Sequence, residues 1–425
     1  MRHCIALRER AHAAYLKGGK VLRAARVATD LANHHFDLME TQSAAAWNQK
    51  ATRLLEDEPE SVEHGWLKET QAIMARGDND IDKIHALSLE ASAIATRFQD
   101  QDLFAISLAT QGLAMTYGGD IDAGLTMVEE ATTGAVNGEL GPWATGWIYC
   151  ISIALHAHVA DWQRAGHWTE AAVDWCNRQA INGFPGVCRV HRAEIMRLRG
   201  DLTVAEEEAR TASIELASFN LMFSAQAFKE LGEVRLKMGD LDGAEEAFRQ
   251  AQEMGVAPQP GLSEALVQRG KTQAAGASIR RALADRSIGP LDRAKLLPTQ
   301  VEISLLLGDR DTARSATSEL GVIAEENGRP ALRAAAAAAS AAVGLADGEL
   351  GGALTSAEEA RALFREIDLV YEVARTTQLV GQIHMALGDA DEATSELDAA
   401  LSTFDIVGAV PDAARVRDLL AARVG

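Results

Sequence analysis

The sequence predicts an all-α protein, a superhelical solenoid of stacked helical hairpins with about ten hairpins and a C-terminal cap helix. Two observations support this prediction. A short glycine-containing phrase recurs along the chain, and the apolar residues between its copies follow helical spacing. The composition agrees, because only 5% of the 425 residues are aromatic and alanine dominates the hydrophobic 47%.

The recurring phrase joins an apolar helix end, a Gly-Asp turn and, a few residues later, an alanine. Copies read Met238-Gly239-Asp240 before Ala244, Leu307-Gly308-Asp309 before Ala313, and Leu387-Gly388-Asp389 before Ala393. Glycine adopts the left-handed conformation that ends one helix, and aspartate can cap the next helix. We expect the alanine to be small because two helices cross at that point.

From Gly200 onward, the turn glycines recur at the spacing of a helical hairpin. They fall at 200, 239, 270, 308, 348 and 388, which gives intervals of 39, 31, 38, 40 and 40 residues. One hairpin cannot bury its own apolar stripe, so neighbouring hairpins must stack. We therefore expect one solenoid over residues 1–425, with a bend near 255–262 where two prolines interrupt the helical pattern. Residues 413–424 are expected to form the cap helix.

Two segments share a more detailed pattern. The first contains Phe228, Leu231, Gly232, Gly239, Ala244, Phe248 and Ala251. The second contains Val380, Gly381, Gly388, Ala393, Leu397 and Ala400. Both look like tetratricopeptide repeats, with a period longer than the usual repeat of about 34 residues. The resemblance implies a solenoid of divergent tetratricopeptide repeats.

A second resemblance covers nearly the whole chain. It rests on the phrases Val62 to Leu67, Trp168 to Ala171, Asp174 to Cys176, Val187 to Ile195, Pro258 to Leu262 and Leu296 to Ile303. Together they look like the helical-repeat region of LuxR-type ATP-dependent bacterial transcriptional regulators, relatives of the maltose regulator. The resemblance implies a sensor and partner-binding arm. No ATPase module precedes these repeats and no helix-turn-helix reader follows them, so we expect only the function of the arm.

The formal charge of −20 restricts the class of partner. Nucleic acids and anionic membranes attract basic proteins, so we expect neither a direct nucleic-acid partner nor a membrane. A protein or peptide segment, or a small ligand, fits better. Four cysteines form no disulfide framework, and the first residues lack the apolar core of a signal peptide. We therefore expect a cytoplasmic protein.

Tryptophans gather in one region of the chain and give the best candidate for a binding site. Five of the seven lie between residues 143 and 175. The candidate partner-binding residues here are Trp143, Trp147, Tyr149, Trp162, Trp168 and Trp175. In the groove of a solenoid, such side chains can anchor a peptide or an apolar ligand. The alternative is that the rings fill a thicker core between helices.

A charged stretch completes the candidate set. Its members are Arg189, His191, Arg192 and Glu194. The two arginines are three residues apart, so on a helix they could jointly receive an acidic peptide or a carboxylate. The alternative is that these groups form salt bridges between helices.

No motif supports catalysis. Cys188 and His191 are three residues apart, but a metal site needs more ligands and an acyl-transfer site needs an oxyanion hole. We expect no catalytic residue, no metal and no cofactor.

The sequence therefore favours a non-catalytic binding scaffold or sensor arm of a bacterial regulatory system, which binds a protein segment or small ligand along its groove. One alternative is a LuxR-type transcriptional regulator that acts with a separate DNA-binding partner. Another is an atypical helical enzyme with a pocket around residues 143–194. A homo-oligomer is compatible with each of these hypotheses.

Overall fold

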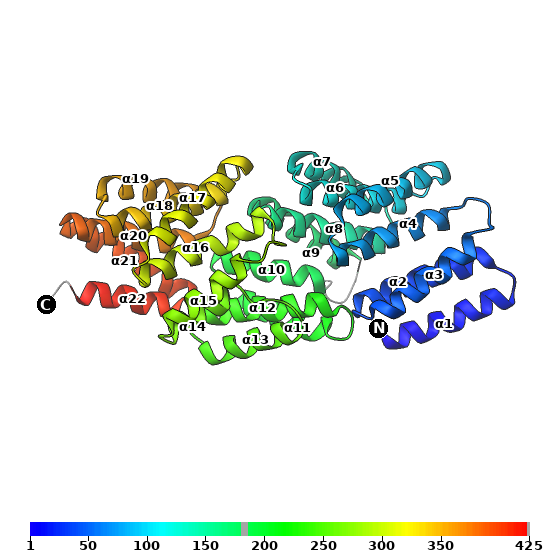
Figure 1. The fold of residues 1–425 in the computed structure, drawn as a ribbon, viewed down its shortest axis with the longest axis horizontal. Coiled ribbons are helices and arrows are strands. Elements are labelled where there is room, and N and C mark those ends of the chain that lie inside the picture. The colour runs from blue at the N-terminus through cyan, green and yellow to red at the C-terminus, as the bar shows by residue number, and fades with distance from the viewer. Residues whose placement is uncertain (180–185, 423–425) are drawn as a thin grey trace. The chain divides into compact units, whose positions relative to one another are not determined.

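The computed structural model describes residues 1–179 and 186–422, and within these ranges it contains 22 α-helices, one 3₁₀ helix and no β-strand (Figure 1). The first helices are α1 (Arg2–Lys17), α2 (Val21–Asp37), α3 (Thr41–Leu55), α4 (Val62–Ala75), η1 (Arg76–Asp78), α5 (Ile81–Phe98), α6 (Gln101–Tyr117), α7 (Ile121–Val136), α8 (Pro142–His158), α9 (Trp162–Arg178), α10 (Gly186–Arg199) and α11 (Leu202–Leu216). They are followed by α12 (Leu221–Met238), α13 (Leu241–Glu253), α14 (Gly261–Gln268), α15 (Thr272–Leu283), α16 (Pro290–Leu306), α17 (Arg310–Asn327), α18 (Pro330–Asp347), α19 (Leu350–Glu366), α20 (Val370–Leu387), α21 (Ala390–Val407) and α22 (Val410–Ala421). The predicted all-α fold of helical hairpins is confirmed.

The helices form two compact units. The N-terminal unit comprises residues 1–156, 167–188 and 214–224, and the C-terminal unit comprises residues 157–166, 189–213 and 225–425. The single continuous solenoid and its bend near 255–262 stay predictions. None of the helices that the structure describes is long and apolar enough to cross a membrane.

The predicted left-handed turn glycines are confirmed, and the predicted aspartate cap is confirmed at Asp240 and Asp309 but not at Asp389, whose side chain accepts no capping hydrogen bond. All six turn glycines from Gly200 to Gly388 have positive φ angles, between 74° and 87°, which favour glycine. Asp240 and Asp309 each accept a hydrogen bond from a backbone N–H in the first turn of the following helix. The predicted cap helix over residues 413–424 lies within α22 as far as Ala421, while residues 423–425 lie outside the described residues.

In the N-terminal unit, α2, α4 and α6 are the first helices of consecutive hairpins and pack side by side, α2 against α4 and α4 against α6. Small residues permit close helix crossings. At the crossing of α6 and α7, a Cβ atom added to Gly112 would lie 2.5 Å from the carbonyl oxygen of Gly124. The row of first helices carries the residues of the site described below.

The C-terminal unit folds back on itself. One apolar contact joins α11 and α12 to α20, α21 and α22, which lie far away in the sequence. The core residues in this contact include Leu202, Val234, Tyr371, Leu397, Phe404 and Val416. Phe404 is fully buried, and its ring lies 6.0 Å from that of Tyr371 in an edge-to-face arrangement. Hairpins at the C-terminal end therefore cover helices near the beginning of the same unit.

Charged groups inside this unit are paired with one another. The guanidinium of Arg197 donates from Nε to Oε1 of Glu230 at 2.5 Å, and both side chains are largely buried. Arg375 pairs with Glu302, and the hydroxyl of Tyr371 donates to Oδ2 of Asp412 at 2.9 Å. Burial lowers the pKa of Arg197, but the facing carboxylates of Glu230 and other acidic residues outweigh burial and raise it above its ordinary value.

Candidate binding groove of the N-terminal unit

Three helices of the N-terminal unit place four side chains in a stacked row, which we call the aromatic ladder. It consists of Arg26 on α2, Trp66 on α4, and Trp143 and Trp147 on α8. The guanidinium carbon of Arg26 lies 3.9 Å from the centroid of the Trp66 ring. The Trp66 and Trp143 centroids are 5.9 Å apart, and Trp143 stacks on Trp147 at 6.1 Å with only 8° between the ring planes.

Trp143 leaves most of its surface in water. It is 57% exposed, whereas Trp66 is 7% exposed. A large aromatic ring that is held in place by two others and remains accessible has little conformational entropy to lose on binding. The indole N–H of Trp147 is buried and has no hydrogen-bond partner within the described residues. The ladder therefore provides a rigid apolar surface beside an unused donor.

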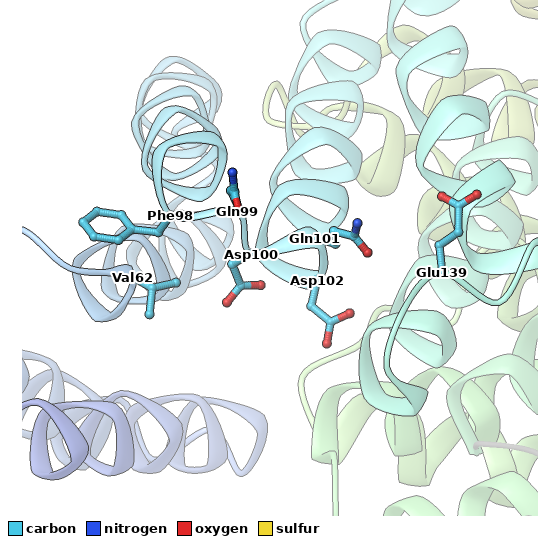
Figure 2. A pocket seen from close by; sticks show the side chains of 7 residues that line it. All are labelled: Val62, Phe98, Gln99, Asp100, Gln101, Asp102 and Glu139. Atoms are coloured by element: carbon cyan, nitrogen blue, oxygen red, sulfur yellow. The ribbon is translucent and has the colours of Figure 1, made fainter.

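An open acidic depression of about 480 Å³ in the surface, called the acidic cavity below, adjoins the ladder (Figure 2). It is lined by Val62, Phe98, Gln99, Asp100, Gln101, Asp102 and Glu139. Asp100 caps α6 through the backbone N–H of Leu103, and its other oxygen accepts the indole N–H of Trp66 at 3.1 Å. Oδ1 of Asp102 accepts the backbone N–H of Gly141 at 2.8 Å, two residues before Trp143. These hydrogen bonds connect the wall of the cavity to the ladder.

The carboxylates of the cavity form no ion pair with a basic side chain in the described part of the chain. In Figure 2, Asp100 and Asp102 point to the same side of the first turn of α6. Among residues 1–179 and 186–422, no lysine, arginine or histidine forms an ion pair with Asp100, Asp102 or Glu139. The cavity therefore concentrates negative charge beside an exposed tryptophan, which favours a ligand that is both cationic and apolar.

The predicted aromatic residues divide between surface and core. Trp143 and Trp147 belong to the ladder. Tyr149 is only 2% exposed and Trp175 is also buried, with their ring centroids 6.1 Å apart, and burial raises the pKa of the Tyr149 hydroxyl. Trp162, at the first position of α9, and Trp168 are half-buried, and the ring of Trp168 meets that of His167 edge to face. The core interpretation describes Tyr149 and Trp175, and a role of Trp143 and Trp147 in binding stays a prediction.

The predicted charged residues lie in the C-terminal unit. Arg189 and Arg192 both donate to Glu208, at 2.7 and 2.6 Å, so the pair holds a carboxylate of the same chain. His191 lies 3.9 Å from Glu194. Burial raises the pKa of Glu194, but the nearby His191 and the charges of Lys295 and Arg197 outweigh it and lower the pKa to about 2. The role of these four residues in binding a partner stays a prediction.

Cys188 does not resemble a nucleophile. Its side chain is buried, and burial together with the neighbouring Cys150 raises the pKa of its thiol well above the ordinary value. A nucleophilic cysteine needs the opposite shift, because the thiolate is the reactive form. Within the described residues, no group of three histidine, cysteine, aspartate or glutamate side chains is arranged to hold a metal ion.

Several residues of the groove were missed by the sequence reasoning. Trp66 lies within the phrase Val62 to Leu67, where it was treated as part of a resemblance and not as a contact of Trp143. Asp100 and Asp102 stand at the start of the buried helix α6, which is the ordinary position of capping acids. No sequence pattern around Arg26 indicates that its side chain lies on a tryptophan. Only the packing of first helices from separate hairpins brings these residues together.

The comparisons agree with the fold. Residues 225–254 match the tetratricopeptide repeat family. No curated protein matches the sequence. The solved structures similar to this chain include a Rap protein complexed with competence and sporulation factor, at 12% identity and a TM-score of 0.45, covering 90% of this chain and 98% of that chain.

Two further structures show the same level of similarity. The human IFIT1 dimer with m7Gppp-AAAA has 12% identity and a TM-score of 0.45, covering 89% of this chain and 90% of that chain. The anaphase-promoting complex hetero-tetramer Cut9–Hcn1 has 12% identity and a TM-score of 0.43, covering 95% of this chain and 88% of that chain. From the repeat match and the all-α architecture, the chain contains a tetratricopeptide-like helical-repeat region.

Proposed function

We propose that the chain is a non-catalytic binding scaffold that takes a protein segment in the groove of its N-terminal unit. The observation that supports this proposal most directly is the exposed face of Trp143, held between Trp66 and Trp147 at the edge of the acidic cavity. Tryptophans in such positions supply most of the binding energy at protein interfaces.

The chemistry of the groove selects the partner. Three carboxylates that have no basic partner among the described residues line the cavity, so a lysine or arginine of the bound segment would place its charge there. An apolar or aromatic side chain next to that basic residue would lie on Trp143. A volume of about 480 Å³ is enough for one or two side chains, which suits a short extended segment.

In the cell, the scaffold would act as the sensor arm of a bacterial regulatory system. This finer role follows from the resemblance of its repeats to those of LuxR-type regulators. Segment binding in the groove would then be the input, and a separate DNA-binding partner would deliver the output.

The experiment is a selection of random peptides displayed on phage, carried out on the full chain, followed by anisotropy titrations of the enriched sequences. We expect enriched peptides to carry lysine or arginine next to an aromatic or aliphatic residue. Replacing the central tryptophan, Trp143→Ala, is expected to weaken their binding about 30-fold or more, because such anchors contribute 2 kcal/mol or more.

A matched control comes from the C-terminal unit, where Ile406 is a large apolar residue with 82% exposure. The variant Ile406→Ala should bind the selected peptides as tightly as the unchanged protein. The proposal is contradicted if no sequence is enriched, or if the enriched peptides bind the Trp143→Ala variant with undiminished affinity.

A further inference from the structure

The aromatic ladder contains one tryptophan that already carries a cation of its own chain. The guanidinium carbon of Arg26 lies 3.9 Å from the centroid of the Trp66 ring, and Oδ2 of Asp100 accepts the indole N–H of Trp66 at 3.1 Å. Trp66 therefore has a guanidinium on its face and a carboxylate at its edge. A guanidinium suits this position because it is planar, weakly hydrated and stacks on aromatic rings.

Trp143 has the carboxylate of such an arrangement nearby but not the cation. Oδ1 of Asp102 accepts the backbone N–H of Gly141 at 2.8 Å, two residues before Trp143. A Cβ atom added to Gly141 would lie 2.7 Å from Oδ2 of Asp102, so both oxygens lie against the turn that leads into α8. Trp143 is 57% exposed, and no cation from the described part of the chain lies on its ring.

The two aspartates differ in the acceptor capacity that they leave open. Both oxygens of Asp100 are engaged, Oδ1 by the backbone N–H of Leu103 and Oδ2 by Trp66. Oδ2 of Asp102 receives no hydrogen bond and no ion pair from any residue that the structure describes. Asp102 lines the acidic cavity and points to the same side of α6 as Asp100 (Figure 2). A cation that enters the cavity therefore meets an open carboxylate oxygen beside the turn that carries Trp143.

Lysine and arginine differ in how they can use this position. An ammonium is a compact, strongly hydrated charge, which gains little from a depression that is open to water. A guanidinium can donate in its plane to Asp102 while one of its weakly hydrated faces lies against an indole, as Arg26 does on Trp66. A metal ion fits less well, since the described residues contain no group of three metal-ligating side chains.

We propose that the basic residue of the bound segment is an arginine, whose guanidinium donates to Oδ2 of Asp102 at the edge of the Trp143 ring. This inference rests on the proposed function, in which a neighbouring apolar side chain of the segment covers the exposed face of Trp143. It narrows the partner from basic segments in general to segments that carry arginine.

The test uses the full chain and three synthetic probes, titrated by ligand-observed NMR. The probes are acetyl-leucyl-arginyl-leucine amide and its counterparts with lysine or citrulline at the central position. Citrulline keeps the shape of arginine but lacks the charge. We expect the arginine probe to bind about tenfold more tightly than the lysine probe, and more tightly still than the citrulline probe.

The outcomes separate this inference from the proposed function. If the arginine and lysine probes bind equally and both lose affinity in Trp143→Ala, the choice of arginine is wrong and the binding groove stands. Equal binding of the arginine and citrulline probes would overturn the inference, as would the absence of saturable binding by the arginine probe up to about 10 mM. The peptide selection described above decides the proposed function independently of these probes.

Two variants test the role of Asp102. Asp102→Asn keeps an oxygen that can accept the Gly141 N–H but removes the charge, so it should weaken binding of the arginine probe about tenfold. It should also abolish the preference for arginine over citrulline, which a general loss of structure would not do selectively. The exposed acid variant Glu130→Gln on α7 is the matched control and should leave binding unchanged. An undiminished arginine preference in Asp102→Asn would refute the assignment.

Discussion

Paired charges inside the C-terminal unit contrast with the carboxylates that line the acidic cavity of the N-terminal unit. In the C-terminal unit, Arg197 pairs with Glu230, Arg375 pairs with Glu302, and Tyr371 donates to Asp412. In the N-terminal unit, Asp100, Asp102 and Glu139 of the cavity form no ion pair with a described residue, and elsewhere in this unit burial raises the pKa of Glu69 to about 7. The charged groups of the C-terminal unit balance one another, whereas the carboxylates of the cavity could be balanced by a bound cation.

This difference distinguishes charged groups that stabilise the fold from charged groups that are available to a ligand. Buried charges that satisfy one another need no ligand, and their role is to fix the packing around them. Buried polar groups that the fold leaves unsatisfied lower the stability of the free protein, and they persist where binding supplies the missing partner. Both units are built from helical hairpins, so their difference in charge pairing lies in the side chains that the helices carry.

Removing one member of a paired group should have the largest effect. Arg197→Ala would leave Glu230 buried and uncompensated, so we expect it to lower the free energy of unfolding of the C-terminal unit by about 3–5 kcal/mol. Replacing both partners together, as Arg197→Met with Glu230→Leu, should recover most of the loss. Urea unfolding followed by circular dichroism measures both. An Arg197→Ala variant as stable as the unchanged protein would break the comparison.

The ring pair of Tyr149 and Trp175 should distinguish core from groove among the aromatic residues. Trp175→Ala removes a buried side chain and is expected to cost about 3–4 kcal/mol, since aromatic truncations in cores leave cavities. Trp143→Ala removes an exposed ring and should cost under about 1 kcal/mol. Thermal unfolding compares the two variants, and a larger loss for Trp143→Ala would contradict the assignment of its ring to a binding surface.

The buried carboxyl group of Glu69 should make its own unit sensitive to pH. The folded-state pKa of Glu69 is raised to about 7, so the unfolded chain ionises first as pH rises from about 4.5. Ionisation in the unfolded chain therefore reduces stability progressively up to about pH 7, by roughly 1–3 kcal/mol for this group. Glu69→Gln should be the more stable protein at pH 8, and the advantage should vanish near pH 4.5. A constant difference across this range would exclude the buried acid as its source.

Turn glycines should give the smallest effect, and the same effect in both units. Gly119 and Gly388 have φ angles of +101° and +87°, and a Cβ atom at either position would meet nothing within 4 Å. Alanine at each site should therefore cost only the backbone strain, about 1 kcal/mol. Unequal losses in the two thermal unfolding curves would show that the units differ in their turns as well as in their inner helices.

The sequence was sufficient for the repeat architecture because each turn carries its own local chemistry. Gly239 and Asp240 end one helix and cap the next, whatever the rest of the chain does. It was also sufficient for one contact of the aromatic ladder, since Trp143 and Trp147 lie four residues apart on one helix and stack.

The other contacts depend on packing between hairpins. Trp66 meets Trp143, and Asn33 meets Thr70, only because first helices of separate hairpins pack together. Arg189 and Arg192 show the converse, because their spacing suggested a ligand site and Glu208 from the next helix occupies both guanidinium groups. No sequence pattern around the two arginines predicts that Glu208 would pair with them.

The most direct test of the account is to locate the bound segment. A peptide enriched by selection on the full chain, with a photoreactive phenylalanine in place of its aromatic residue, would be cross-linked to the protein and the attachment sites identified by mass spectrometry. We predict attachment near the aromatic ladder and the acidic cavity, on α4, α6 or α8. Attachment confined to α12–α22 of the C-terminal unit would contradict the claim that unsatisfied groups mark the binding surface.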